Sequence, residues 1–247
     1  MLTVNHLATD HPDLITQPDW SLSDRVRCFS LCAPDWLAYP PSNCQGFIPR
    51  RRAARTQLAN RLHPVVPQWL TQVHSRQVIH TEQPQNCPVA DGSYSTQQHQ
   101  ACVVVTADCL PVVMASRTSP WVAVVHAGWR GLYQNIIACA LQQVRGDPKD
   151  CAAWIGPHIS ARSYVVDAAF KARFLAQNTH YEPCFSAQDG AIHCNLSAIA
   201  RLQLTQAGLA EPHIHAAPQC TFADKRYPSY RRDGPKASRL VTMAWLL

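Results

Sequence analysis

The sequence contains no apolar run of the roughly 20 residues that a membrane-spanning helix requires. Its first ten residues include neither the basic segment nor the apolar core of a secretory signal. These two absences argue against insertion into a membrane and against export. We therefore expect a cytoplasmic location and no membrane partner.

Lysine is scarce: in 247 residues only Lys149, Lys171, Lys225 and Lys236 occur, so arginine carries nearly all of the net charge of +6. The guanidinium group suits two-point contacts with phosphate and carboxylate groups. The sequence also has no long basic stripe with interleaved aromatic residues, which is the usual footprint of nucleic-acid binding. We therefore expect small-molecule ligands and no nucleic-acid partner.

Cysteine pairing motifs are also missing. The 11 cysteines are an odd number, their spacing is irregular, and no Cys-x-x-Cys pair occurs. A protein without a secretory signal is expected in a reducing compartment, where thiols stay free. Cysteines within apolar runs, such as Cys102, Cys139 and Cys151, are expected to be small buried apolar side chains.

Neither an internal repeat nor a low-complexity linker divides the chain, which indicates one domain over residues 1–247. Continuous apolar runs predict strands that are buried on both faces. Asp167 and Asn195 are typical helix caps, and Gly208 is a typical helix stop. Strands are predicted over 25–31, 69–74, 102–106, 112–115, 121–125, 152–155 and 240–247, and helices over 49–62, over 132–144, and after Asp167 and Asn195. This mixture indicates an α+β or layered α/β domain.

Three side chains of metal-ligand type stand at the ends of apolar stretches: His74, Cys109 and His126. Rigid strand ends commonly direct such residues into a loop-lined cleft. Two imidazoles and one thiolate match the preference of Zn²⁺ and leave a fourth position for water, and copper also accepts this set. Their spacing matches no compact zinc motif. Hydrogen-bonded structural histidines and a core cysteine are therefore the alternative.

Asp108 directly precedes Cys109 and has two possible roles. On a strand the two side chains would point to opposite faces, and Asp108 would hold backbone N–H groups or an arginine. In a turn its carboxylate would join the site. Gly128 and Gly131 bracket Trp129 and Arg130 ahead of a helix, and glycines there permit close backbone approach. That pattern is compatible with a phosphate at the helix start or with a simple tight turn.

These segments belong to an ordered set of short motifs, which together resemble the YfiH family, also called the laccase-domain or polyphenol-oxidase-like family. The resemblance covers about residues 55–247. In chain order the motifs are Asn60-Arg61-Leu62, Gln72-Val73-His74-Ser75, Ala90-Asp91-Gly92, Asp108-Cys109-Leu110-Pro111, His126-Ala127-Gly128-Trp129-Arg130-Gly131, Ile155-Gly156-Pro157, Cys220-Thr221, Tyr230-Arg231-Arg232-Asp233-Gly234 and Trp245.

The resemblance implies a metal on His74, Cys109 and His126, since family members carry one on a His, a Cys and a second His. That metal is usually taken as zinc, and copper has been proposed. Members are similar in phosphorolysing adenosine, inosine, guanosine or methylthioadenosine and in deaminating adenosine. Their fold resembles a single-domain, layered αββα sandwich that a glutamine-deamidating bacterial toxin also has. We therefore expect a zinc-dependent purine nucleoside enzyme.

The chain departs from the family pattern at several positions. Residues 42–46 hold only a remnant of the family's Gly-rich N-terminal stretch. His158 replaces a common Cys, Asn195 replaces a common Asp, and Ser238 stands where Gly is usual before Arg239. These changes affect the expected substrate pocket and leave the three expected ligands intact.

Further residues follow from this hypothesis. A zinc ion would supply a nucleophilic water for attack at C6 of adenine, as in zinc nucleobase deaminases. Such enzymes also need a carboxylic acid to shuttle protons, and Asp91 and Asp108 are the two candidates. Phosphorolysis requires phosphate to be held against the anomeric carbon, and Arg130, Arg231 and Arg232 are the predicted substrate-binding residues. Their alternative role is surface or structural ion pairing.

Other functions use the same residues. A cysteine hydrolase or deamidase would employ Cys109 as nucleophile, with His126 or His74 as base. A copper-dependent polyphenol oxidase is less favoured, because a multicopper centre needs many histidines and the chain has one His-x-His pair, His213 and His215. The last alternative is a non-enzymatic zinc protein, whose closed site would need a fourth ligand such as Cys102 or His80.

Overall fold

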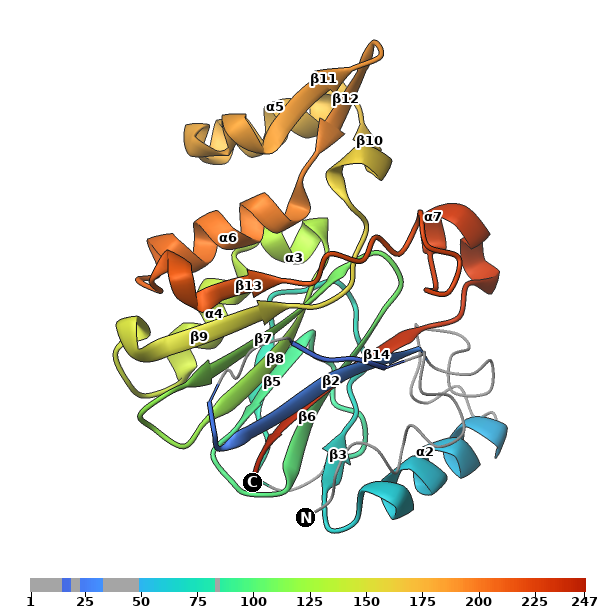
Figure 1. Ribbon diagram of the computed structural model, residues 1–247, viewed down its shortest axis with the longest axis vertical. Coiled ribbons are helices and arrows are strands. Elements are labelled where there is room, and N and C mark those ends of the chain that lie inside the picture. The colour runs from blue at the N-terminus through green and yellow to red at the C-terminus, as the bar shows by residue number, and fades with distance from the viewer. Residues whose placement is uncertain (1–14, 19–22, 33–48, 83–84) are drawn as a thin grey trace.

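The structure is a computed structural model that describes residues 15–18, 23–32, 49–82 and 85–247 (Figure 1). The remnant of the Gly-rich stretch at residues 42–46 lies outside the described residues. The described part contains two large mixed sheets, one small sheet and several helices. The predicted α+β class is therefore confirmed.

The first large sheet has five strands in the order β1-β2-β14-β6-β3. Its pairs are antiparallel except for β3, which runs parallel to β6. The strands are β1 (Ile15–Thr16), β2 (Val26–Cys32), β3 (Val66–Gln68), β6 (Gln100–Thr106) and β14 (Leu240–Leu246).

The second large sheet has six strands in the order β13-β9-β7-β8-β5-β4. The pairs at its two edges are parallel and the inner pairs are antiparallel. The strands are β4 (Val78–His80), β5 (Gly92–Ser95), β7 (Leu110–Ser116), β8 (Val122–Ala127), β9 (Cys151–Ile155) and β13 (Ile214–Ala216). Every residue of β7 and β8 is buried, as their continuous apolar runs predict.

Helices cover the outer faces of both sheets, and a small sheet projects beyond them. The helices are α2 (Pro49–Leu62), α3 (Trp129–Tyr133), α4 (Ile136–Gln143), α5 (Ala168–Gln177), α6 (Leu196–Gln206) and α7 (Tyr230–Asp233). The small sheet comprises β10 (Val165–Val166), β11 (Phe185–Gln188) and β12 (Ala191–Cys194). Figure 1 shows β11, β12 and α5 at the top, beyond α6.

Three apolar clusters define the layers. Between the two large sheets, Val104 of β6 belongs to the same cluster as Val113 of β7. Leu58 of α2 packs on the outer face of the five-stranded sheet. Ile137 of α4 and Ile199 of α6 pack on the outer face of the six-stranded sheet. The order helix, sheet, sheet, helix confirms the layered αββα arrangement (Figure 1).

Two sequence predictions were wrong. Residues 69–74 form no strand and contribute only one isolated bridge, Thr71 with Val89. Gln72 uses its side-chain amide, in place of its backbone, to bond both N–H and C=O of Val105. The predicted helix over 132–144 is two helices, because Asn135 adopts a left-handed conformation with φ 57° between α3 and α4.

Helix caps and cysteines mostly follow the expectations. The side chains of Asp167 and Asn195 accept hydrogen bonds from the first turns of α5 and α6. The ten cysteines that the structure describes are all free. Cys102 and Cys151 are buried as expected, whereas Cys139 is only half-buried. No helix within the described ranges is both long and apolar enough to cross a membrane.

Candidate metal centre and its cavity

His74, Cys109 and His126 come from three separate segments and meet at one end of the two sheets. Cys109 lies where the chain passes from β6 in one sheet to β7 in the other. His126 is near the end of β8, the antiparallel neighbour of β7. His74 lies in the loop between β3 and β4. Their ligand atoms are all within 4.8 Å of one another, so the structure brings together the three residues that the sequence analysis selected.

The β7–β8 register explains why a glycine follows β8. Leu110 pairs with Ala127, so the preceding Cys109 lies opposite Gly128. A Cβ atom on Gly128 would be 2.7 Å from Cys109 Sγ and 3.4 Å from a ring carbon of His74. The close approach foreseen at this glycine is therefore an approach to the candidate ligands themselves.

Asp91 holds two of the three candidate ligands in place. Its fully buried carboxylate accepts hydrogen bonds from three successive backbone N–H groups, those of Val73, His74 and Ser75, and from the Ser75 hydroxyl. Wrapping three N–H groups around one carboxylate requires a left-handed residue, and His74 has φ 60°. The same carboxylate lies 2.9 Å from His126 Nδ1. His126 Nε2 is thereby left to face Cys109 and His74.

The charges of this cluster are coupled. Burial would raise the pKa of the Cys109 thiol, but the charges and hydrogen bonds of His126 and His74 outweigh burial and lower it to about 6. Burial would lower the pKa of His126, but Cys109 and Asp91 outweigh it and raise it to about 9. Burial also opposes ionisation of Asp91, yet the hydrogen bonds from His126 and Ser75 lower its pKa to about 2. A thiolate, the form that binds metals and attacks carbonyl carbons, is thus favoured.

The donor set fits a zinc ion. An ion with bonds of about 2.0–2.3 Å could contact all three donor atoms after small side-chain movements. A metal-ligating histidine commonly donates its other ring N–H to a carboxylate, which is what Asp91 receives from His126. Neither Cys102 nor His80, the residues suggested as a fourth ligand, belongs to this group. Cys102 contacts the Val122 carbonyl, and His80 pairs with Glu82. Within the described residues the arrangement is therefore that of an open site.

A cavity of about 490 Å³ opens on the three candidate ligands. Its lining includes the aromatic side chains of Trp129, Tyr164 and Tyr230, and an arginine lies over the ring of each of the first two. Arg130 lies 4.3 Å above the Trp129 ring and Arg231 lies 4.9 Å above the Tyr164 ring. The lining residues are Gln72, His74, Val105, Thr106, Ala107, Asp108, Cys109, His126, Trp129, Arg130, Ile159, Tyr164, Tyr230, Arg231 and Arg239.

Asp108 lines this cavity, but its carboxylate is directed at the protein. It occupies a turn with φ 84°, and its oxygens accept from the Thr221 hydroxyl (2.7 Å), the Ser229 hydroxyl (3.0 Å) and the Arg231 backbone N–H (2.6 Å). Asp108 therefore holds the segment that carries Tyr230 and Arg231 against the cavity.

The structure separates the three arginines expected to bind substrate. Arg130 and Arg231 are exposed and line the cavity. Arg232 does not line it: its guanidinium donates to the carbonyls of Thr221, Phe222 and Tyr227 and pairs with Asp233. This is the structural ion-pairing role that the sequence analysis left open.

Several residues of the cavity were not selected as site residues from the sequence, among them Thr106, Trp129, Tyr164 and Arg239. Thr106 stands two residues before one noted motif, Trp129 lies inside another, and Arg239 was noted only as the residue after a departure from the family pattern. A search for aromatic and hydroxyl residues next to the ligand motifs would have found the first two. Tyr164 belongs to no such motif, and its position depends on the fold.

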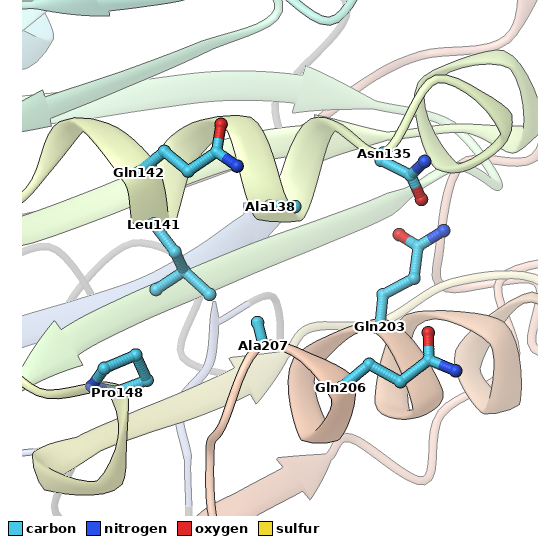
Figure 2. Close-up of a pocket in the computed structure, with 8 residues that line it drawn as sticks. All are labelled: Asn135, Ala138, Leu141, Gln142, Pro148, Gln203, Gln206 and Ala207. Carbon is cyan, nitrogen blue, oxygen red and sulfur yellow. The ribbon is translucent and has the colours of Figure 1, made fainter.

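A second hollow of about 340 Å³ lies between α4 and α6 (Figure 2). Figure 2 shows carboxamide side chains from both helices, among them Asn135 and Gln203 at the right, and apolar side chains that include Leu141 and Pro148 at the left. None of its lining residues is titratable or metal-ligating. This hollow therefore offers no candidate acid, base, nucleophile or metal ligand of its own.

Comparisons with known proteins show which family this chain belongs to. Residues 50–247 match a family model described as multi-copper polyphenol oxidoreductase laccase. A protein of Xylella fastidiosa named purine nucleoside phosphorylase is 33% identical over 219 residues, which cover 83% of each chain. The Escherichia coli protein named purine nucleoside phosphorylase YfiH is 32% identical over 186 residues, or 74% of this chain and 75% of that one.

Solved structures show the same fold. A crystal structure of a Neisseria meningitidis protein superposes with a TM-score of 0.81 at 26% identity, covering 95% of this chain and 99% of that one. Bacillus licheniformis YfiH superposes with a TM-score of 0.70 over 83% and 82% of the two chains. The family model spans most of the chain, and the ordered motifs and the fold agree with it. The chain is a member of the YfiH, or laccase-domain, family.

Proposed function

We propose that this protein is a zinc-dependent purine nucleoside enzyme, which phosphorolyses adenosine, inosine, guanosine or methylthioadenosine and deaminates adenosine. The observation that carries the proposal is the convergence of His74, Cys109 and His126 at a cavity with arginine-bearing walls. Relatives named purine nucleoside phosphorylase, about one third identical to this chain, support it. A cytoplasmic location remains a prediction.

In this proposal His74, Cys109 and His126 hold the metal. Zinc bound there would supply a Lewis acid and a water that is nucleophilic near neutral pH. Asp91 fixes the ring orientation of His126 and the backbone of the His74 loop. Asp91 thereby acts as a positioning residue, because its oxygens are occupied by five donors and it is fully buried.

Asp108 is also a positioning residue in this proposal, since three donors occupy its carboxylate. Neither carboxylate that the sequence offered as a proton shuttle is then free to reach substrate. Tyr164 is a different source of a hydrogen bond. Burial and the charge of Cys109 raise the pKa of its phenol, so it stays protonated at the cavity wall.

The cavity walls suit a planar base and an anion. Trp129 and Tyr164 provide aromatic surface for stacking, and Arg130 and Arg231 provide positive charge beside them. Asp108 is the one carboxylate among the lining residues, whereas three of them are arginines: Arg130, Arg231 and Arg239. The cavity therefore attracts anions such as phosphate. Arg232 has no substrate contact in this proposal.

The test is to incubate adenosine with and without inorganic phosphate and to separate the products by chromatography. Phosphorolysis yields adenine only when phosphate is present, whereas deamination yields inosine without phosphate and inosine or hypoxanthine with it, because inosine is itself a proposed substrate of phosphorolysis. His74→Ala, Cys109→Ala and His126→Ala should each abolish formation of both products. Arg226→Ala is the control, because Arg226 is exposed and does not line the cavity, and it should leave both activities unchanged. Wild-type protein that is folded and zinc-loaded but makes neither product would refute the proposal.

A cysteine hydrolase or deamidase is the second candidate, and one observation favours it. Cys109, His126 and Asp91 form a chain in which the thiol pKa is lowered to about 6 and His126 is oriented by a carboxylate. In that case Cys109 attacks an amide or thioester carbon and His126 protonates the leaving group. Turnover of such substrates in the presence of a chelator, lost in Cys109→Ser, would support this candidate over the first.

Copper oxidation of phenols has less support. The family description names a multi-copper oxidase, but a search of the described residues finds one group of three metal-ligating side chains. His213 and His215, the one His-x-His pair, instead contact Arg117 and the Pro212 carbonyl. Copper at the His74, Cys109 and His126 group alone would be a single-ion site, whereas a multicopper oxidase needs several copper ions.

A further inference from the structure

Tyr230 is the most exposed of the three aromatic side chains that line the cavity. It is 53% exposed, whereas Trp129 and Tyr164 are half-buried. In the part of the chain that the structure describes, no aromatic ring packs against the Tyr230 ring, no cation lies over it, and its hydroxyl has no hydrogen-bond partner. An open aromatic surface beside a cavity is what a ligand-contacting residue presents before its ligand binds.

The other two rings already carry cations on part of their surface. The guanidinium groups of Arg130 and Arg173 lie 4.3 Å and 5.6 Å from the centre of the Trp129 ring. That of Arg231 lies 4.9 Å from the centre of the Tyr164 ring. A guanidinium over a ring is attracted to the same π surface on which a base would stack. Trp129 and Tyr164 therefore offer a base only the ring surface that these arginines leave open.

The backbone that carries Tyr230 is anchored on both sides of this residue. The preceding Ser229 hydroxyl donates to the Asp108 carboxylate and accepts from the Arg232 N–H. The N–H of the following Arg231 donates to the same carboxylate at 2.6 Å. A fixed backbone that presents an open ring is preorganised, because little further order is imposed when a ligand stacks on the ring.

We propose that Tyr230 is the side chain on which the purine base of the substrate stacks. This inference rests on the proposed function and names the residue that recognises the base. Stacking on an aromatic ring requires a π face and no particular pattern of donors and acceptors, so it tolerates different bases. That tolerance suits an enzyme proposed to act on adenosine, inosine and guanosine alike.

The arginine next to Tyr230 is held independently of the Tyr230 ring. The Arg231 guanidinium lies over Tyr164 and donates to the Val165 carbonyl. The Arg231 backbone N–H is bonded to Asp108. Loss of the Tyr230 ring removes none of these contacts. It should therefore weaken binding of the nucleoside and leave binding of phosphate unchanged.

The experiment compares Tyr230→Ala, which removes the ring, with Tyr230→Phe, which keeps the ring and removes the hydroxyl. Val66→Ala is the matched control, because Val66 is 44% exposed but belongs to β3 and does not line the cavity. Binding of adenine to the zinc-loaded proteins is measured by titration calorimetry. Zinc content, the KM for phosphate, and the KM for adenosine in deamination and in phosphorolysis are measured on the same samples.

Tyr230→Ala should weaken adenine binding and raise the KM for adenosine about 5- to 100-fold, which is the range expected for loss of one base–aromatic stack. The KM for adenosine should rise equally in deamination and phosphorolysis, since both reactions bind the same base. It should rise more than kcat falls, because stacking holds the ground state and the transition state alike. Zinc content and the KM for phosphate should match wild type. Tyr230→Phe and Val66→Ala should behave like wild type in every measurement.

Adenine affinity and a KM for adenosine equal to those of wild type in Tyr230→Ala would overturn the inference alone. A parallel rise in the KM for phosphate, or loss of zinc, would also overturn it, because Tyr230 would then support the segment and not the base. Wild-type protein that binds adenine but forms no product refutes the proposed function, and the calorimetry of Tyr230→Ala still decides the inference. Wild-type protein that neither binds adenine nor forms a product refutes both.

Discussion

Two buried carboxylates flank the candidate centre, and each organises a different side of the cavity. Asp91 gathers the His74 loop and His126, so it organises the metal side. Asp108 gathers Thr221, Ser229 and the backbone of Arg231, so it organises the substrate side. Both Asp91 and Asp108 position other residues, so a carboxylate near a reactive centre need not take part in proton transfer. Here the number of donors around each carboxylate indicates its role better than its distance from the ligands.

The largest effect is expected from Asp91→Asn, which breaks the metal side. An amide NH₂ group would face N–H donors that now contact a carboxylate, so the His74 loop and His126 would lose their orientation. Removing one partner of a buried ionic network costs about 3–5 kcal/mol, and loss of an orienting partner weakens metal binding about 10- to 100-fold. Denaturant unfolding and zinc titration measure these effects. Asp224→Asn, which removes an exposed ion pair with Arg226, serves as the control and should change little. Unchanged zinc affinity in Asp91→Asn would contradict the assignment.

A smaller and different effect is expected from Asp108→Asn. The Arg231 N–H and two hydroxyls would lose a charged acceptor, at a cost of about 2 kcal/mol. The segment carrying Tyr230 and Arg231 would loosen, which should raise the KM for substrate while zinc content stays at the wild-type level. Metal analysis and steady-state kinetics check both parts. Loss of zinc without a change in KM would show that the two carboxylates do not have separate roles.

Gly128→Ala sharpens the comparison, because it touches the metal side without altering a charge. Its new Cβ would lie 2.7 Å from Cys109 Sγ, so the Cys109 side chain or the backbone just before β7 and just after β8 must shift. We expect about tenfold weaker zinc binding, which corresponds to about 1.4 kcal/mol. The measurement is a competition titration against a chelator of known affinity. Zinc binding equal to that of wild type would indicate that Cys109 does not hold the ion.

The smallest effect is expected in the second hollow. Ala207→Leu places a larger apolar side chain in the space between α4 and α6 (Figure 2). Because no titratable residue lines that hollow, zinc content and nucleoside turnover should match wild type, with stability within about 0.5 kcal/mol. Thermal unfolding and the activity assay test this. A tenfold loss of activity would show that the second hollow influences the first cavity.

Much of the fold could be predicted because the central strands are continuous apolar runs. Residues 102–106 and 112–115 were predicted as strands and lie within β6 and β7, and the predicted strand over 121–125 overlaps β8, which begins at Val122. The short strand β5, with sequence Gly-Ser-Tyr-Ser, is polar and was missed, because its burial comes from neighbouring strands. The break between α3 and α4 was missed for a similar reason. The left-handed Asn135 has no sequence signal as strong as a glycine or proline.

The candidate ligands could be selected from the sequence, because each has a distinctive side chain at the end of an apolar stretch. The roles of their neighbours could not. The nest of N–H groups around Asp91 joins segments that are separate in the chain, and only the fold brings them together. Arg231 and Arg232 are adjacent and chemically identical, yet one faces the cavity and the other caps backbone carbonyls. Which of the two arginines faces the cavity depends on tertiary packing, which cannot be inferred from the motif.

The central claim is that His74, Cys109 and His126 jointly hold one zinc ion. The most direct measurement is metal analysis by mass spectrometry of protein purified without a metal-binding tag, for wild type and for His74→Ala, Cys109→Ala and His126→Ala. The account predicts about one zinc per wild-type chain and a large loss of zinc in each variant, with folding retained. Folded wild-type protein that contains no metal and binds none on titration would contradict the account and leave Cys109 as a nucleophile.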